Sequence, residues 1–409
     1  MAFIIAEIGT SHEGNLDKAK SLIDCAFDAG SDAVKFQWVY ADEILHPKTG
    51  FVKLPTGNIP LYDRFKALEC PFSFYEKVRD YSEKKGIKFI CSPFGLRSLS
   101  ELLQLSPCAV KIASPELNHY PMLSVLAEYR ENQLLAGEPA VPVILSSGVS
   151  TLSDIEKALS YFENGKGNCA KKSSGKVSRE ANVPDKCKAP DAVRCKEAAS
   201  VLPDLTLLHC ITSYPAPESE YNVRLIETLR NVLGVSTGLS DHSLDPVLVP
   251  VLSVLCGAEV IEKHITLSRK TSGLDDPVAL EGEQFAIMVH AVHQTQALLN
   301  RYGKERGKQE MFKQLSESYP AEKIEACLGN GVKNLAPSEK ENYGRTNRSL
   351  HYMRSLCAGE KISEEDVKVL RTEKVLSPGI SPEFLKLVTG ATLKKSVEDG
   401  AGVRFEDFV

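Results

Sequence analysis

The sequence predicts an α/β protein made of a (β/α)8 barrel and a small C-terminal module. Short apolar runs recur eight times, amphipathic helical stretches lie between them, and a different local pattern begins at about residue 349. A chain of 409 residues is long enough for one large domain and one smaller one. Its 43% hydrophobic and 25% charged residues are typical of a globular protein.

The predicted strands are short apolar segments that alternate with predicted helices. The strands are AFIIAEI (2–8), AVKFQ (33–37), IKFICS (87–92), AVKIAS (109–114), VILSS (143–147), LTLLHC (205–210), VSTGLS (235–240) and VIEKHI (260–265). The helices are predicted at 16–29, 74–84, 152–162, 223–233, 247–255 and 282–301, with weaker patterns at 98–105 and 121–131. Eight repeats in about 300 residues favour a barrel over an open doubly wound sheet, which has similar local patterning.

A polar, lysine-rich segment interrupts the repeats at residues 163–197. It is poor in large apolar residues, which predicts a surface excursion between the fifth and sixth repeats. It contains Cys169, Cys187 and Cys195, but their irregular spacing and the lack of a histidine among them favour an exposed loop over a zinc site. The chain has 11 cysteines and no CxxC pair, so we expect reduced thiols rather than a disulfide framework.

The chain changes character after the eighth repeat. Residues 303–348 are charged and contain scattered Gly and Pro, which predicts a linker with some helix. In the remaining residues, 349–409, GEKISEEDV (359–367) and GAGVRFEDF (400–408) share the pattern G-x-x-[Ile/Val]-x-x-Glu-Asp-[Val/Phe]. We therefore divide the chain into a barrel at 1–302, a linker and a C-terminal module.

The net charge of the chain does not indicate a macromolecular partner. A formal charge of -5 gives no positive excess, so neither nucleic acid nor an anionic membrane surface is expected to bind. No apolar stretch approaches the roughly 20 residues of a membrane span. The first residues, MAFIIAEIGT, indicate a strand rather than a secretion signal. We expect a cytoplasmic protein.

Side chains with reactive groups gather at the predicted ends of the strands. In a (β/α)8 barrel these ends share one rim, where groups from different strands surround one point. The candidates are Glu7, Lys35, Gln37, Ser92, Lys111, Ser114, Glu116, Ser146, Ser213, Tyr214, Ser240, His242 and His264. They indicate two neighbouring sub-sites, one for an anion and one for a metal ion.

Lys35 and Lys111 indicate the anion sub-site. Each alternates with apolar neighbours along its strand, so both ammonium groups are expected inside the barrel, where a charge must be paired. A phosphate or carboxylate would satisfy the two lysines and the nearby serine hydroxyls. The alternative is pairing with a local carboxylate such as Glu7 or Glu116. A class I aldolase would instead use one of the lysines to form a Schiff base.

His242 and His264 indicate the metal sub-site because they end consecutive strands. Two neutral imidazoles with open positions suit Mn2+ or Mg2+ polarising a carbonyl better than a closed zinc site. A structural hydrogen-bonding role for each histidine is the alternative. Glu7 is then a candidate for handling a proton or orienting water, although an ion pair with Lys35 would also explain it.

The segments together resemble the N-acetylneuraminate (sialic acid) synthase family over nearly the whole chain. The matching motifs are AEIGTSHEGN (6–15), AVKFQ, FICSPF (89–94), VKIASPELNHYP (110–121), ILSSG (144–148), LLHCITSYPAP (207–217), GLSDHSLD (238–245) and IEKHIT (261–266). The resemblance implies a barrel fused to an antifreeze-like SAF domain that crosses to the other subunit of a dimer. It also implies condensation of phosphoenolpyruvate with the aldehyde of an N-acetylated hexose, which gives a nine-carbon 2-keto sugar acid and phosphate by C–O cleavage.

The resemblance also implies residue roles. Phosphoenolpyruvate contacts are implied for Lys35, Ser92, Lys111, Ser114, Ser146, Ser213 and Ser240, and sugar contacts for Gln37, Glu116 and Tyr214. Glu7 resembles the catalytic carboxylate, and His242 and His264 resemble the divalent-metal ligands. Arg371 resembles the arginine that the SAF domain contributes to the neighbouring subunit's sugar pocket. The chain departs from the family at Thr372, where a proline is usual, and at Thr212 or Ser213, where an asparagine near the phosphate is usual.

Three further functions fit parts of this pattern. A different phosphoenolpyruvate–aldehyde synthase would take a phosphorylated sugar, but no further Lys/Arg cluster at the strand ends supplies a second anion site. A class I aldolase would share the barrel and its lysines, and a carbohydrate-binding protein would keep the C-terminal module beside an inert barrel. Within the sialic acid synthase family, the motifs leave open whether the product is N-acetylneuraminate, legionaminate or pseudaminate.

Overall fold

The computed structural model describes residues 1–54, 57–163, 202–271 and 273–408. The segment predicted to be a surface excursion lies outside the described residues from 164 onward. Cys169, Cys187 and Cys195 therefore also lie outside them.

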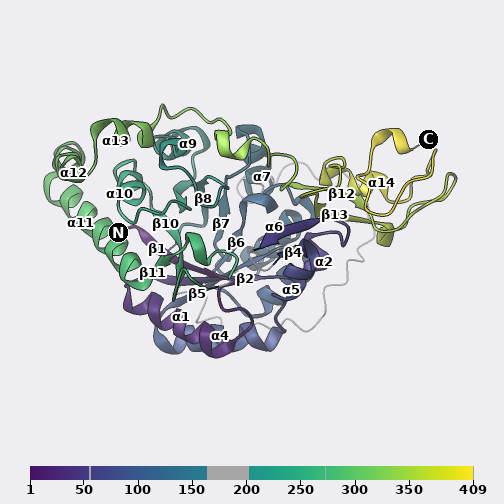
Figure 1. The fold of residues 1–409 in the computed structure, drawn as a ribbon, viewed down its shortest axis with the longest axis horizontal. Coiled ribbons are helices and arrows are strands. Elements are labelled where there is room, and N and C mark those ends of the chain that lie inside the picture. The colour runs from purple at the N-terminus through teal and green to yellow at the C-terminus, as the bar shows by residue number, and fades with distance from the viewer. Residues whose placement is uncertain (55–56, 164–201, 272, 409) are drawn as a thin grey trace.

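Eight parallel strands close into a barrel (Figure 1). They are β1 (Phe3–Gly9), β2 (Ala33–Trp38), β5 (Lys88–Pro93), β6 (Ala109–Ile112), β7 (Val143–Ser146), β8 (Leu205–Cys210), β9 (Ser236–Asp241) and β10 (Val260–Thr266). Neighbours in this order are hydrogen-bonded, and β10 pairs with β1 to complete the ring. The short β11 (Leu280–Glu281) pairs with the end of β10. The predicted (β/α)8 barrel is confirmed.

Helices cover the outside of the barrel. They are α1 (Leu16–Asp28), α4 (Phe72–Lys85), α5 (Leu96–Gln104), α6 (Tyr120–Leu135), α7 (Leu152–Glu163), α9 (Leu225–Leu233), α10 (Leu248–Leu255) and α11 (Gly282–Tyr302). Asn15 caps the start of α1, because its side chain accepts hydrogen bonds from the N–H groups of Asp17 and Lys18 at 2.9 and 3.0 Å. Within the described ranges, no helix is both long and apolar enough to cross a membrane.

Alternation along the strands decides which side chains face the interior. In β1, Ile4 and Ala6 belong to the large apolar cluster beneath the helices, whereas Phe3 and Ile5 belong to a smaller cluster drawn from the inner faces of the strands. Glu7 continues the inner series, so its carboxylate lies inside the barrel above an apolar floor. The register places Glu7 beside Lys35 of β2 and beside His264 of β10.

Two regions differ from their predicted form. The segment between β2 and α4 contains α2 (Ala41–Ile44), the antiparallel pair β3 (Phe51–Leu54) and β4 (Gly57–Pro60), and α3 (Leu61–Lys66), none of which the apolar pattern indicates. The predicted linker begins with two helices, α12 (Lys304–Ser318) and α13 (Ala321–Leu328), which pack against α11 and α10. The first half of that linker therefore extends the helical cover of the barrel.

The C-terminal module has its own core and lies opposite the N-terminus (Figure 1). Its strands β12 (Arg348–Tyr352) and β13 (Val367–Arg371) pair antiparallel, and β13 contacts α2 of the barrel. The repeated motif of GEKISEEDV and GAGVRFEDF forms a short 3-10 turn in both copies. In these turns the Asp366 and Asp407 carboxylates accept hydrogen bonds from the N–H groups of Ser363 and Arg404 at 2.8 and 2.7 Å.

Candidate active site

Glu7 is held by the two neighbouring polar residues of β2. Its Oε2 lies 3.0 Å from Lys35 Nζ, and its Oε1 accepts a hydrogen bond from Gln37 Nε2 at 2.8 Å. Glu7 is 1% exposed and Lys35 is 3% exposed. The ion pair between Glu7 and Lys35, which the sequence left as an alternative, is therefore present. It fixes the direction of the Glu7 carboxylate toward the barrel axis.

Glu262 of β10 joins the two lysines. Its Oε2 lies 3.5 Å from Lys35 Nζ, and its Oε1 lies 3.7 Å from Lys111 Nζ. Ser240 donates a hydrogen bond to the same Oε1 at 3.0 Å. Burial acts to raise the pKa of Glu262, but the ammonium groups of Lys111 and Lys35 outweigh burial and lower it to about 2. Glu262 is thus an ionised counterion that sequence reasoning missed.

The two lysines and two glutamates balance in formal charge. Burial lowers the pKa of Lys111, which has Glu262 as its carboxylate neighbour. Burial also acts to lower the pKa of Lys35, but the carboxylates of Glu262 and Glu7 raise it above its usual value. Glu116 takes no part in this balance, although the sequence offered it as a partner for a lysine. The four side chains form what we call the charge quartet: Glu7, Lys35, Lys111 and Glu262.

Serine and threonine hydroxyls follow the same strand ends as the charge quartet, and Ser92 and Ser240 contact it directly. Ser92 accepts a hydrogen bond from Lys35 at 3.3 Å, and Ser114 accepts one from the Gly148 N–H at 3.0 Å. The hydroxyls of Ser146 and Thr212 are buried without a hydrogen-bond partner in the described part of the chain.

Ser213 is turned away from these hydroxyls. Its hydroxyl donates to the Pro215 carbonyl in its own loop at 3.1 Å, in an exposed position. Of the two residues at the place of the family asparagine, the structure therefore brings Thr212 to the interior and not Ser213.

His242 and His264 face one another at the ends of β9 and β10. Their ring centroids lie 5.4 Å apart, and both side chains are buried. His242 Nδ1 donates to the Ile211 carbonyl at 2.7 Å. Among the described residues, neither His242 Nε2 nor His264 Nδ1 has a hydrogen-bond partner. The ring of Tyr214 packs over both, with centroids 4.3 Å from His242 and 6.1 Å from His264.

The donor set fits an open metal site rather than a closed one. Across the described ranges, no three His, Cys, Asp or Glu side chains gather closely enough to hold a metal ion by themselves. Two imidazoles with free ring nitrogens would leave the other positions to water and substrate, as hard cations such as Mg2+ and Mn2+ allow. The histidine pair therefore fits the divalent ion expected from the sequence.

Asp275, in the loop after β10, completes the rim beside the histidines. Its Oδ2 lies 3.8 Å from His264 Nδ1, and burial raises its pKa to about 6. A Cβ atom on Gly9 would lie 3.1–3.3 Å from Gln37 Nε2, Asp275 Oδ2 and Glu7 Oε1. Gly9, at φ +57°, therefore leaves open space where three polar groups converge. The sequence pattern did not indicate Asp275 because it lies in a loop without periodicity.

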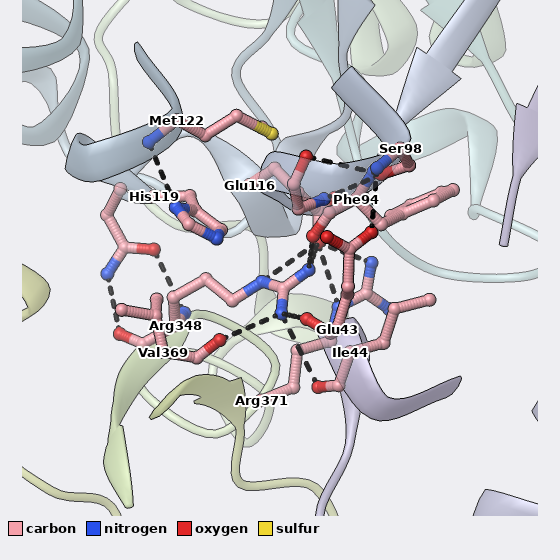
Figure 2. Close-up of polar contacts among 12 residues, drawn as sticks. Glu43, Ile44, Phe94, Ser98, Glu116, His119, Met122, Arg348, Val369 and Arg371 are labelled. Atoms are coloured by element: carbon pink, nitrogen blue, oxygen red, sulfur yellow. Dashed lines mark hydrogen bonds and ion pairs between the residues drawn. The ribbon is translucent and has the colours of Figure 1, made fainter. Parts of the chain in front are cut away.

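Arginines of the C-terminal module reach the rim at Glu116 (Figure 2). Glu116 Oε1 lies 2.9 Å from Arg348 Nη2 and 2.7 Å from Arg371 Nη2, and all three residues are buried. Arg348 Nη2 also donates to the Phe94 carbonyl at 2.6 Å. Arg371 thus contacts Glu116 of its own chain, whereas the resemblance implies that it reaches the sugar pocket of the neighbouring subunit. Arg348 was not predicted.

Comparison with known proteins identifies the family. The model of the NeuB family matches residues 22–304, and that of the SAF domain matches residues 347–409. The chain belongs to the NeuB family.

Relatives in the NeuB family match along the whole chain. An N,N'-diacetyllegionaminic acid synthase of Legionella pneumophila is 27% identical over 99% of this chain and 94% of its own. A pseudaminic acid synthase of Campylobacter jejuni is 27% identical over 99% of this chain and 96% of its own. The crystal structure of the Bacillus subtilis spore coat polysaccharide biosynthesis protein spsE superposes with a TM-score of 0.75, at 27% identity, over 100% of this chain and 95% of that one.

These matches confirm three predictions from the sequence. The family resemblance, the SAF domain at the C-terminus and a synthase-type enzyme are all supported by the NeuB and SAF matches and by the relatives. The residue roles, the metal ion and the exchange of SAF domains between subunits stay predictions.

Proposed function

We propose that this NeuB-family enzyme condenses phosphoenolpyruvate with the open-chain aldehyde of an N-acetylated hexose. The products are a nine-carbon 2-keto sugar acid and phosphate. The observation that carries the proposal is the buried charge quartet beside the facing histidines, at one mouth of a closed barrel. The names of the legionaminic and pseudaminic acid synthases among its relatives support a sugar acceptor of this class.

The quartet's residues suit an anionic substrate with two charged ends. Lys35 and Lys111 would bind the phosphate and carboxylate of phosphoenolpyruvate, with the hydroxyls of Ser92, Ser114 and Ser240 as further donors. The attack of C3 on the aldehyde leaves positive charge at C2, which Glu7 is placed to stabilise or to quench by orienting water. Water addition at C2 is followed by loss of phosphate with cleavage of the C–O bond.

His242 and His264 would hold a divalent ion, which supplies Lewis-acid polarisation of the aldehyde oxygen. The charge balance of the quartet supports a requirement for a divalent ion. Because the quartet is formally neutral without ligands, an anionic phosphoenolpyruvate adds uncompensated negative charge to a buried site. A divalent cation at the adjacent histidines offsets that charge.

The first test is phosphate release. With purified enzyme, we expect phosphate to leave phosphoenolpyruvate only when both an N-acetylhexosamine and Mn2+ or Mg2+ are present. Mass spectrometry of products from a panel of N-acetylated hexoses would then identify the nine-carbon acid. Phosphate release with a phosphorylated sugar alone, or a lysine adduct trapped by borohydride, would contradict the proposal in favour of a phosphosugar synthase or an aldolase.

We predict that metal affinity falls as the pH drops below about 8. Burial acts to lower the pKa of His242, but the neighbouring Cys210 and the Ile211 carbonyl raise it to about 8. A protonated imidazole cannot bind a cation, so the dissociation constant of Mn2+ should rise about tenfold per pH unit from pH 8 to pH 6. Burial holds the pKa of His264 at about 3, so His264 adds no proton in this range. Calorimetric titration would measure the slope, and a flat profile would exclude His242 as a ligand.

We predict that Arg371→Ala weakens use of the acceptor sugar more than use of phosphoenolpyruvate. The change removes one of two guanidinium groups from Glu116 at the rim, away from the charge quartet. We expect KM for the sugar to rise about tenfold, as for loss of a charged hydrogen bond, with KM for phosphoenolpyruvate nearly unchanged. Lys368→Ala, a half-exposed position on the same strand, is the control. Equal rises in both KM values would contradict a sugar-side role.

The dimer is part of the proposal. The resemblance implies that each subunit's SAF domain closes the other's barrel. In such a dimer, the contact between Arg371 and Glu116 that the structure shows within one chain would form between subunits. Light scattering of the purified chain would measure the oligomeric state, and a strictly monomeric active enzyme would rule out this exchange.

A further inference from the structure

The loops after β7 and β8 are tied together by one carboxylate from the linker. Glu339 lies in the short turn η4 (Pro337–Glu339) and is 1% exposed. Its Oε1 accepts hydrogen bonds from the backbone N–H groups of Val149 at 2.8 Å and Thr212 at 2.7 Å, and its Oε2 accepts one from Ala336 at 3.3 Å. Val149 follows β7 and Thr212 follows β8, so Glu339 fixes the distance between two adjacent strand ends.

Val149 has an unfavourable backbone conformation, which the hydrogen bond from its N–H to Glu339 helps to hold. Its φ is +43°, in the left-handed region that β-branched residues avoid, and such a residue costs about 1–3 kcal/mol unless its surroundings hold it. Glu339 binds the N–H of Val149, and the side-chain amide of Asn347 donates to its carbonyl at 3.0 Å. Two linker side chains therefore bind both polar groups of the strained residue.

The tied loops carry hydroxyls of the proposed phosphoenolpyruvate site. The Gly148 N–H, next to Val149, donates to Ser114 Oγ at 3.0 Å. A Cβ atom on Gly148 would overlap Thr212 Oγ1 and would lie 2.8 Å from Ser114 Oγ and 3.2 Å from Glu339 Oε1. Ser114, Thr212 and Glu339 thus converge on one glycine, and the buried Thr212 hydroxyl has no partner within the described residues.

We infer that Glu339 is a positioning residue for the phosphate of phosphoenolpyruvate. It acts through the Val149 and Thr212 amides, which place the loops so that the hydroxyls of Ser114 and Thr212 converge on one ligand. It does not itself touch the substrate. The inference rests on the proposed function, and it adds a residue from the linker to a site otherwise built by the barrel.

Two conservative variants separate position from charge. Glu339→Asp keeps the charge but is one methylene too short to reach both amides, so about tenfold higher KM and Kd for phosphoenolpyruvate are expected. Glu339→Gln keeps an oxygen at the position that accepts both amides and loses only the longer 3.3 Å hydrogen bond from the Ala336 N–H, so values within about threefold of wild type are expected. KM for the acceptor sugar should change less than about threefold in both. Calorimetry with phosphoenolpyruvate and Mn2+, without acceptor, gives Kd independently of turnover.

Glu341→Asp is the matched control, because Glu341 is exposed and lies two residues along the same linker. It should behave as wild type. A wild-type Kd in Glu339→Asp, or equal losses of phosphoenolpyruvate and sugar use, would overturn the positioning role. A larger loss in Glu339→Gln than in Glu339→Asp would also overturn it, because charge would then matter more than reach. Failure of wild type itself to bind phosphoenolpyruvate would instead overturn the proposed function.

Discussion

His264→Ala is expected to lower the rate of phosphate release at least about a thousandfold, the scale of losing Lewis-acid stabilisation of developing charge. The change removes one of two facing imidazoles whose ring centroids lie 5.4 Å apart, and a single remaining histidine cannot hold a divalent ion tightly. Wild-type enzyme treated with a chelator should fall to the same residual rate. Adding Mn2+ should restore the wild type and leave the variant inactive.

The control for this prediction is His290→Ala. His290 is exposed on α11, on the outer surface of the barrel, so its loss should leave the rate unchanged. A His264→Ala enzyme that keeps its full rate in the presence of chelator would show that the histidine pair is structural. Metal binding measured by calorimetry would separate loss of the ion from loss of the fold.

Glu262→Gln is expected to reduce kcat/KM for phosphoenolpyruvate about a hundredfold to a thousandfold, as for other losses of preorganised charge in a buried site. The glutamine cannot compensate the ammonium groups of Lys35 and Lys111, which lie 3.5 and 3.7 Å from the carboxylate. Breaking a buried ion pair by removing one partner costs about 3–5 kcal/mol, so denaturant unfolding should show a similar loss of stability.

The pH dependence of Glu262→Gln tests whether its loss of activity comes from deprotonation of Lys111. Burial already lowers the pKa of Lys111, and removing Glu262 removes the main opposing interaction. Lys111 should therefore lose its proton at lower pH in Glu262→Gln than in wild type, and at saturating Mn2+ the activity should recover partly as the pH falls. Glu259→Gln, a half-exposed position just before β10 that pairs with Arg230, is the control and should change stability by less than about 1 kcal/mol. Loss of activity without any difference in pH profile would contradict the assignment of Lys111.

The barrel could be predicted because its strands are buried on both faces. Segments such as FIIAEIG and VILS are nearly continuous apolar runs of the length of one strand, with helical periodicity between them. The hairpin of β3 and β4 has no such pattern, and its first residue, Phe51, is exposed. The helices α12 and α13 were expected only as some helix in a linker, because charged residues dominate their exposed faces.

The active site could be predicted where it follows strand periodicity and not elsewhere. Lys35, Lys111 and His264 are visible as polar residues at inward positions of apolar strands. Glu262 lies two residues before His264 and so shares its face, which means that the same periodicity could have indicated it. Arg348 carries no local signal, because its partner Glu116 is 232 residues away in the chain. Such long-range ion pairs require the fold to be known.

The apolar cluster at the bottom of the barrel determines from which end its interior can be reached. Phe3, Ile5 and their neighbours close the barrel at the starts of the strands, so small molecules can reach its interior only through the opposite mouth. The SAF domain lies at that mouth, where Arg348 and Arg371 form ion pairs with Glu116. A change that weakens these ion pairs is therefore expected to widen access to the interior of the barrel.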